Sequence, residues 1–351
     1  MKFLFSVFIV VFYCQVLEAQ IIQEYDLEKQ AEHAEVKGYD PDFRVNYFEN
    51  IILRTNFTSD VPRMEVSNKI TNETFDIRPA VEYQIGYSAD YKWFAIGFGF
   101  SPNFLLTSKD QAELSNSSSY TVSLNFFFSD RWRQELKYSY YKGFFTDNSD
   151  LDFSNTELQG VEGGTYFIIN PNFSFRAHYA QTERQLKSTG SFIPRLNYIY
   201  SKLRPNIISI LSNTVNSPNI GPVDVITSLD IIAQIGYIHT FVIKNKWFAT
   251  FGLHPGLGYN YSEYELVDSN SSRSSFQNLS FALNSEVSIG YNAYRWFFGA
   301  TGDFKNYNYS NIQNDGFNRN TNYFSLYLGY RFNDNRPMRN FFGWFEDKFG
   351  F

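Results

Sequence analysis

Apolar and polar side chains alternate at every second position in long stretches between residues 75 and 332. In one such stretch, Phe281, Leu283, Val287 and Ile289 alternate with small or polar residues. A period of two is typical of a β-strand with two unlike faces. Such strands must either pack as a sandwich or close into a barrel, and this choice separates a soluble protein from a membrane protein.

The aromatic content favours the barrel. Phe, Tyr and Trp make up 20% of the chain, with 38 Phe and 26 Tyr, more than a soluble domain buries easily. A lipid-facing band with aromatic girdles would accommodate them. A sandwich explains the alternation equally well but not the aromatic content. We therefore predict an all-β fold, a single antiparallel transmembrane β-barrel of 12 to 14 strands.

Short turns and longer polar loops alternate along the chain, as expected when all short turns share one rim of a barrel. The short turns are expected near Asp90, Asp130, Pro171, Asn245 and Arg295, and the longer loops over 60–74, 107–118, 146–160, 268–275 and 308–320. Strands are expected over 50–57, 75–88, 92–100, 120–128, 132–141, 173–182, 192–200, 228–243, 247–261, 280–294, 296–305 and 323–332. Residues 206–211 could supply a further strand.

The N-terminus indicates export. Lys2, a mostly apolar run over 3–16 and Ala19 at a plausible cleavage point predict a signal peptide over residues 1–19. The run is shorter than the roughly 20 apolar residues of a membrane-spanning helix. The acid-rich residues 20–49 are expected to form a periplasmic lead-in before the barrel over 50–333. We expect the protein in the bacterial outer membrane.

The tail over residues 334–351 follows the last strand. Its apolar positions recur three or four residues apart, which predicts a short amphipathic helix on the inner leaflet or against the barrel mouth. A frayed tail is the alternative, since so short a helix is marginal alone.

Several classes of site find no support in the composition. The only cysteine, Cys14, lies in the predicted signal peptide, so no disulfide or thiolate site is expected in the mature chain. A formal charge of −6 argues against nucleic acid as a partner. Asp147, Asp150 and Asp152 share one loop but lack the spacing of a calcium loop. We expect neither a metal nor a cofactor.

Charged residues inside the strands fall on the less apolar face, which would line the lumen of a barrel. Both signs occur, so they could line a polar pore or form salt bridges that fill it. The candidate lumen-lining residues are Arg54, Arg78, Glu82, Arg133, Glu135, Lys137, Arg176, His178, Glu183, Arg184, Arg195, His254, Glu286 and Arg331.

His178 and His254 are the residues to consider for catalysis, because a hydrolase needs a base beside a serine nucleophile. The simpler interpretation is that both imidazoles form hydrogen bonds in the lumen. The polar segment Thr182–Gly190 could be a gate or a substrate contact at the barrel mouth. It could equally be a hairpin end whose charges pair with neighbouring strands.

Six stretches carry a resemblance to a known family. They are Asp90–Pro102 (DYKWFAIGFGFSP), Tyr140–Phe145 (YYKGFF), Gln181–Phe192 (QTERQLKSTGSF), Gly236–Val242 (GYIHTFV), Pro255–Gly258 (PGLG) and Ser288–Asn292 (SIGYN). In this order the chain resembles the Bacteroidota outer-membrane β-barrel family catalogued as domain of unknown function forty-four twenty-one. The resemblance runs from about Asn50 to Phe332. It implies the fold and the location, and it supplies no activity or catalytic residue.

We expect an outer-membrane barrel that is not an enzyme: a passive channel, a transporter of small solutes or lipid, or a structural surface protein. Its partners would be outer-membrane lipid and small polar solutes. The alternatives are a membrane-embedded lipid hydrolase and a scaffold that binds a periplasmic protein through the lead-in and the tail.

Overall fold

The computed structural model describes residues 27–47, 50–68, 73–105, 117–146, 154–204, 223–266, 273–310 and 315–349. They fall into two compact units, one reaching to Pro41 and one beginning at Asp42. In the first unit, helix α2 (Leu27–Lys37) is followed by Gly38, whose φ of 74° suits glycine. The Gly38 and Tyr39 amides donate to the Ala34 carbonyl at 2.8 and 3.0 Å. The expected signal peptide lies outside the described residues.

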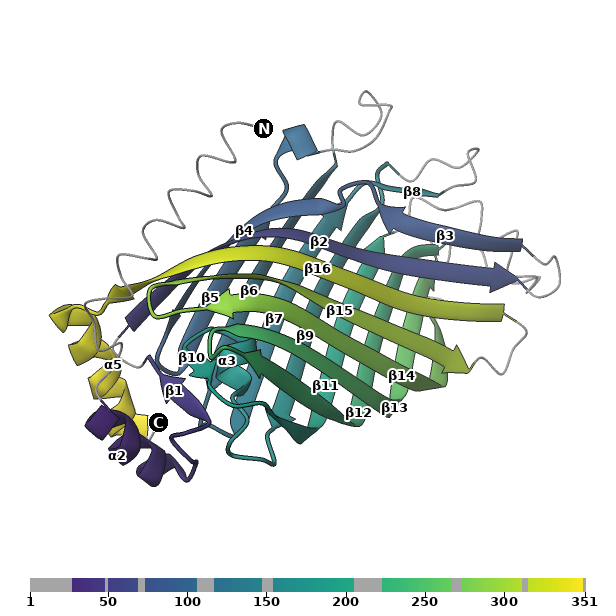
Figure 1. Cartoon of the computed structure of the whole chain (residues 1–351). Coiled ribbons are helices and arrows are strands. Elements are labelled where there is room, and N and C mark those ends of the chain that lie inside the picture. Colours follow the sequence, from purple (N-terminus) through teal and green to yellow (C-terminus); the bar gives the residue numbers. More distant parts are fainter. Residues whose placement is uncertain are drawn as a thin grey trace. The chain divides into compact units, whose positions relative to one another are not determined.

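Twelve antiparallel strands of the second unit close into a barrel (Figure 1). Each strand pairs with the next, and β16 returns to β2 from Asn333↔Asn50 to Asp315↔Asn68. The closed ring lacks the two free edges of an open sheet, and the prediction of one antiparallel barrel is confirmed. The strands are β2 (Asn50–Asn68), β4 (Tyr83–Tyr91), β5 (Phe94–Phe100), β6 (Ser118–Phe127), β7 (Trp132–Lys142), β9 (Glu157–Phe167), β11 (Thr189–Arg204), β12 (Val223–Ile243), β13 (Trp247–Leu266), β14 (Arg273–Asn292), β15 (Trp296–Ser310) and β16 (Asp315–Asn333).

The two ends of the barrel differ in their connections. The short-turn end carries tight turns at Lys92–Trp93 and Lys244–Lys246, and Lys244 and Asn245 both have positive φ, as in a type I′ hairpin. At the opposite end β11 connects to β12 through residues 205–222, which lie outside the described residues together with the suggested strand over 206–211. Strands reach further toward this end than predicted. Much of the loops expected over 60–74 and 308–320 is strand, as are residues 273–275 at the end of the loop expected over 268–275.

The two faces of the strands are as predicted. On β14, Phe281 and Leu283 are 63% and 45% exposed, whereas Ala282 between them is 5% exposed. On β16, Phe324, Leu326 and Leu328 point outward, and Ser325, Tyr327 and Arg331 are buried. The outer face is therefore apolar and the inner face faces a filled lumen.

Aromatic residues gather at the short-turn end on this outer face. Three tryptophans open strands there and contact an aromatic ring of the neighbouring strand. The ring-centroid distances are 5.8 Å for Trp132–Phe167, 5.0 Å for Trp247–Tyr291 and 4.7 Å for Trp296–Tyr330. Such a girdle is typical of a barrel rim at a membrane interface.

The strand expected over 75–88 is interrupted. It consists of β3 (Glu73–Pro79) and β4, both paired with β2. Between the pairs Ile77↔Met64 and Tyr83↔Ser59, residues 78–82 lie opposite residues 60–63, so one extra residue forms a bulge. Pro79, which cannot donate to a ladder, ends β3. Beyond the bulge β3 pairs with β8 (Phe144–Thr146). This pairing joins the segment before β4 directly to the segment after β7, without β5 and β6 between them.

The strand expected over 173–182 is wrong, and β9 replaces it in the ring. Residues 173–182 contain helix α3 (Phe175–Tyr179) and lead into β10 (Glu183–Gln185). The Ser174 hydroxyl caps this helix by accepting from the Ala177 amide at 2.9 Å. Strand β9 was missed because Gly160, Gly163 and Gly164 interrupt its alternation.

The tail contains a helix, α5 (Arg336–Phe349), attached to the short-turn end. The Phe342 ring lies 4.8 Å from Tyr91 and 5.3 Å from Trp93, and Lys92 pairs with Glu346 at 2.7 Å. Phe341 and Trp344 remain 57% and 53% exposed. Among the described residues, no helix is long and apolar enough to cross a membrane.

Asp334 connects the start of this tail to β4 through hydrogen bonds. It accepts from the Tyr91 hydroxyl at 2.8 Å and from Arg339 at 2.6 Å. Burial works against its charge, but the hydrogen bonds from Arg339 and Tyr91 outweigh burial and lower the pKa of Asp334.

Candidate functional site

A segment between β9 and β11 folds into the barrel at the short-turn end. We call residues 168–187 the luminal plug; it contains α3 and β10 (Figure 1). It touches inward-facing residues of strands on several sides of the ring. The Tyr179 carbonyl accepts from Arg54 of β2, the Gln181 carbonyl accepts from Arg331 of β16, and the Tyr179 hydroxyl donates to Glu286 of β14. The plug therefore fills the lumen at this end.

The plug pairs with residues that precede the first barrel strand. Strand β1 (Arg44–Asn46) forms a two-stranded sheet with β10, in the register Arg44↔Gln185 to Asn46↔Glu183. The lead-in expected over residues 20–49 thus enters the lumen from Arg44 onward.

A buried charge cluster fixes this small sheet. Glu183 is fully buried and accepts from Arg44 at 3.1 Å, from Asn46 at 3.0 Å and from the Ser174 hydroxyl at 2.6 Å. Arg44 also pairs with Asp130 at 2.8 Å. Arg176 lies 3.8 Å from Asp130, so two cations face two anions in this cluster. Balanced pairing offsets the cost of burying the four charges.

A second anchor holds the plug where its chain reverses. Gln181 has a φ of 57°, which is unusual for a residue other than glycine. The buried Arg331 donates to its carbonyl at 2.6 Å, and Asn292 donates to its side-chain oxygen at 2.8 Å. The Arg331 guanidinium also lies over the rings of Tyr47 and Phe297, at 4.1 and 4.7 Å.

Glu286 is the centre of a third cluster, at the level of the plug helix. Arg195 donates to it at 2.7 Å and the Tyr179 hydroxyl at 2.6 Å. The nearest nitrogens of His178 and His254 lie 3.6 and 3.7 Å from its oxygens. One carboxylate thus joins the plug to strands β11 and β13.

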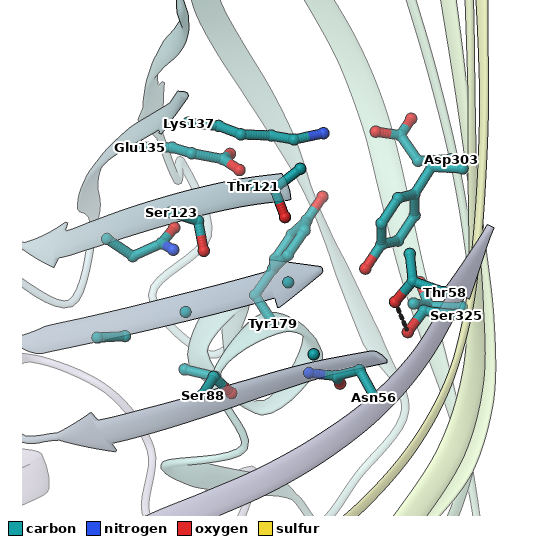
Figure 2. A pocket seen from close by; sticks show the side chains of 18 of the residues that line it. Asn56, Thr58, Ser88, Thr121, Ser123, Glu135, Lys137, Tyr179, Asp303 and Ser325 are labelled. Carbon is teal, nitrogen blue, oxygen red and sulfur yellow. Dashed lines mark hydrogen bonds between the residues drawn. The ribbon is translucent and has the colours of Figure 1, made fainter. Parts of the chain in front are cut away.

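A cavity of about 230 Å³ lies above the plug, away from the short turns. His178, Tyr179 and Ala180 of the plug form part of its lining. Figure 2 shows Tyr179 directed into the cavity, with Lys137 and Asp303 extending from opposite sides.

The walls of the cavity differ in chemistry. The middle of β4, β5 and β6 carries small residues on its inner face: Gly86, Ser88, Gly97, Gly99, Thr121 and Ser123, flanked by Gln84, Asp90, Asn125 and Phe127. The facing strands β7, β11, β14 and β15 present charges: Arg133, Glu135, Lys137, Arg195, Glu286, Asp303 and Lys305. The small residues leave the room that the charged side chains occupy only in part.

Two ion pairs cross the lumen near the far side of the cavity. Lys137 of β7 pairs with Asp60 of β2, and Lys305 of β15 pairs with Glu162 of β9 at 3.3 Å. Neither pair joins neighbouring strands, so each pair spans the interior. A solute entering from the opposite end would have to pass them.

Beyond these pairs the wall's own apolar side chains form two buried clusters. One cluster comprises Ile77, Tyr141, Phe144, Leu158 and Leu203, and another comprises Ile199, Ile232, Ala282, Tyr307 and Tyr309. All ten are buried. In the described part of the chain, the plug therefore fills one side of the cavity, and these two clusters narrow the lumen on the other side.

The residues predicted to line the lumen fall into four groups. Arg54, Arg133, Glu135, Lys137, His178, Arg195 and Glu286 line the cavity. Arg176, Glu183 and Arg184 belong to the plug, and His254 and Arg331 are fully buried inward residues. Arg78 and Glu82 lie apart from the cavity. Arg78 is in β3 with its guanidinium 4.6 Å over the Phe145 ring, and Glu82 is in the bulge.

Sequence reasoning missed several residues of the site. Asp60 was assigned to a loop, and Tyr179 to a strand that does not exist. Asp303 and Lys305 lie inside a correctly predicted strand and alternate with Phe304, which is 44% exposed. That alternation alone identifies Asp303 and Lys305 as inward-facing residues.

One arrangement resembles hydrolase chemistry. The Ser288 hydroxyl lies 3.2 Å from His178 Nδ1, and Glu286 lies 3.6 Å from His178 Nε2. A serine, a base and an acid in this order could activate a nucleophile. Ser288 is 8% exposed and does not line the cavity described above. Within the described ranges, no group of three or more His, Cys, Asp or Glu residues is placed to hold a metal ion.

The family described as Domain of unknown function (DUF4421) matches residues 38–332. The chain belongs to this family. No curated protein matches the chain.

Solved structures with a similar trace include outer-membrane proteins. The outer membrane protease OmpT from Escherichia coli is 9% identical, with 82% of this chain and 98% of that chain covered at a TM-score of 0.34. A bacterial polysaccharide outer membrane secretin is 12% identical, with 81% and 99% covered at a TM-score of 0.33. OprG from Pseudomonas aeruginosa is 11% identical, with 82% and 97% covered at 0.22. Similarity this low carries no argument about the activity of this DUF4421 member.

Proposed function

We propose that this protein is an outer-membrane β-barrel that lets a small polar solute through its lumen when the luminal plug moves. The apolar outer face, the closed backbone pairing and the tryptophan girdle support the membrane location. By the usual arrangement, the short-turn end and the plug would face the periplasm.

The observation that carries the proposal is the way the plug is held. Strand β10 pairs with β1, and among the described strands it has no ladder with the wall. Side-chain hydrogen bonds, ion pairs and apolar packing attach the plug to the barrel. Strands β9 and β11 pair with each other from Arg195↔Tyr166 to Arg204↔Glu157, so the wall does not depend on the plug. The plug can therefore leave the lumen while the barrel stays closed.

The test is conductance in a planar lipid bilayer. The full chain should conduct little, and replacing residues 169–187 by a short Gly-Ser linker should raise the conductance at least about tenfold, because twelve strands enclose more space than their side chains fill. Lys244→Ser, in an exposed turn at the same end, should leave it unchanged. A folded, plugless barrel that conducts no better than the full chain would contradict the proposal.

A second candidate, a membrane-embedded hydrolase, rests on the contacts of His178 with Ser288 and Glu286. The position of Ser288 away from the cavity makes it the weaker candidate. Hydrolysis of short- and long-chain acyl esters by the purified protein, lost in Ser288→Ala and in His178→Gln but kept in Ser325→Ala, would favour the enzyme. We expect no such activity.

A further inference from the structure

The charges around the cavity already neutralise one another. Arg54 lies 3.9 Å from Asp90, Arg133 lies 3.2 Å from Glu135, and Arg195 lies 2.7 Å from Glu286. Lys137 pairs with Asp60, and Lys305 lies 3.8 Å from Asp303. A ligand with a net charge would have to separate one of these pairs and leave a buried charge without its partner. The wall therefore disfavours both anions and cations.

Polar atoms without a partner remain among these paired groups. Arg133 Nη1 and Arg195 Nη2 are buried donors with no hydrogen-bond acceptor in the described residues, and Asp303 Oδ1 is a buried acceptor with no donor. The Arg133 and Arg195 side chains are each 3% exposed, and all three residues line the cavity. Buried polar atoms are usually satisfied. These three atoms are themselves shielded from solvent, but the cavity lining, which includes Asn125 and Asn284, supplies donors and acceptors together.

A hydroxyl group matches such a site because it both donates and accepts. The wall formed by β4, β5 and β6 adds the hydroxyls of Ser88, Thr121 and Ser123. Gly97 and Gly99 leave room for these side chains: a Cβ at Gly97 would meet Ser123 Oγ at 2.5 Å, and a Cβ at Gly99 would meet Thr121 Oγ1 at 2.6 Å. The ring of Tyr179 forms part of the floor (Figure 2).

The volume sets the size of the ligand. About 230 Å³ is just below the range of roughly 300–1,000 Å³ usual for small-molecule pockets. One six-membered ring with its hydroxyl groups fits this space, whereas a longer oligomer does not.

We infer that the cavity above the luminal plug binds one uncharged, polyhydroxylated solute of monosaccharide size. This inference rests on the proposed function, for which it names the class of solute. Charged or zwitterionic solutes would gain less, because their groups compete with pairs that are already formed.

Binding to the intact full-length protein in detergent micelles tests the inference. Isothermal titration calorimetry would use D-glucose, D-galactose, D-mannose and myo-inositol as probes, with glycine and succinate as zwitterionic and anionic comparators. We expect one polyol to bind at one site per chain. Asp303→Asn should weaken that binding about tenfold, because it replaces a charged acceptor.

A matched pair of variants locates the site. Gly86→Leu should abolish binding by filling the cavity. A Cβ at Gly86 meets its nearest atoms at 3.4 and 3.6 Å, so the backbone need not move. Ala89→Leu places the same side chain on the outer face of the same strand and should bind as the natural protein does. Ser123→Leu is a second cavity-filling variant should Gly86→Leu fail to fold.

Three results would overturn the inference: binding of glycine or succinate but of no polyol, polyol binding that survives both cavity-filling variants, or no binding at all. If the plugless barrel conducts while the intact protein binds no polyol, only the class of solute is wrong. If the plugless barrel does not conduct but the polyol binds, the proposed passage is wrong and the site stands.

Discussion

The two ends of the lumen are filled by different parts of the chain. At the short-turn end a separate segment fills the barrel, and a balanced cluster of Arg44, Arg176, Asp130 and Glu183 holds it. At the opposite end the wall's own aliphatic and aromatic side chains narrow the lumen. A separate segment can move while the ring stays paired, whereas side chains of the wall can withdraw only if the sheet itself changes shape. We therefore expect the plug, at the short-turn end, to be the part that moves.

The largest expected effect comes from breaking the charge cluster. Glu183→Gln leaves Arg44 and Arg176 with only one carboxylate, and breaking a buried pair costs about 3–5 kcal/mol. We expect the plug to loosen, seen as faster proteolysis within residues 168–187 and as frequent channel openings. Glu82→Gln, the same change in the bulge, should show neither effect. A Glu183→Gln protein with a protected plug and unchanged conductance would show that the cluster does not hold the plug.

A large-to-small substitution at the opposite end should lower the stability of the protein without opening the channel. Ile232 is fully buried there, and Ile232→Ala should lower the free energy of unfolding by about 2–5 kcal/mol through lost packing. Conductance should stay low, because the plug remains in place. Thermal unfolding followed by gel mobility, together with bilayer recordings, measures both quantities. Openings as frequent as those of Glu183→Gln would remove the difference between the two ends.

The assignment of the outer and inner faces of the wall can be tested with two neighbouring residues of β6. Leu124 faces outward opposite Ile96 and Leu136, and Ser123 faces the cavity. Leu124→Lys should destabilise the inserted barrel by about 2–4 kcal/mol, the cost of a lysine in mid-bilayer. Ser123→Lys should fold nearly as well as the natural protein. Equal tolerance of both changes in a membrane-insertion assay would contradict the outer and inner faces assigned here.

The smallest effect concerns Asp334 at the short-turn rim. Because its folded pKa is lowered, its contribution to holding α5 is present above the ordinary aspartate pKa of about 3.9 and is lost as the pH falls through the folded value. Fluorescence of Trp344, which is 53% exposed, should report the release of α5 in acid. Asp334→Asn should remove this pH dependence, whereas Asp347→Asn should retain it.

The wall was predictable because its signal is local and repeated. Each strand carries its own alternation, as Phe281 to Ile289 do, and the outer face tolerates almost no charge. The bulge at Ala80–Glu82 depends on the register with β2, which residues near it in sequence do not reveal.

The plug was not predictable from the same signal. Phe173, Phe175, Ala177 and Tyr179 alternate as a strand would. Phe175–Tyr179 nevertheless form a short helix, because Ser174 caps it and the lumen accommodates Arg176 and His178. Its partners Arg44 and Asp130 lie 139 and 53 positions before Glu183. These residues come together only in the closed barrel, so their pairing cannot be recognised in a single sequence. The charged wall of the cavity was largely named in advance, because inward positions follow from the alternation.

The position of β1 before β2 in the chain has a consequence for assembly. The seam of the ring joins β2 to β16, and its Asn50–Asn333 contact spans 283 positions, so we expect this seam to form late. Arg44–Asn46 would then already lie inside the curved sheet when β2 pairs with β16. We expect the inner sheet to serve as a core around which the nascent cylinder wraps. A time course of crosslinking in which cysteines across the seam join before those between β1 and β10 would refute that order.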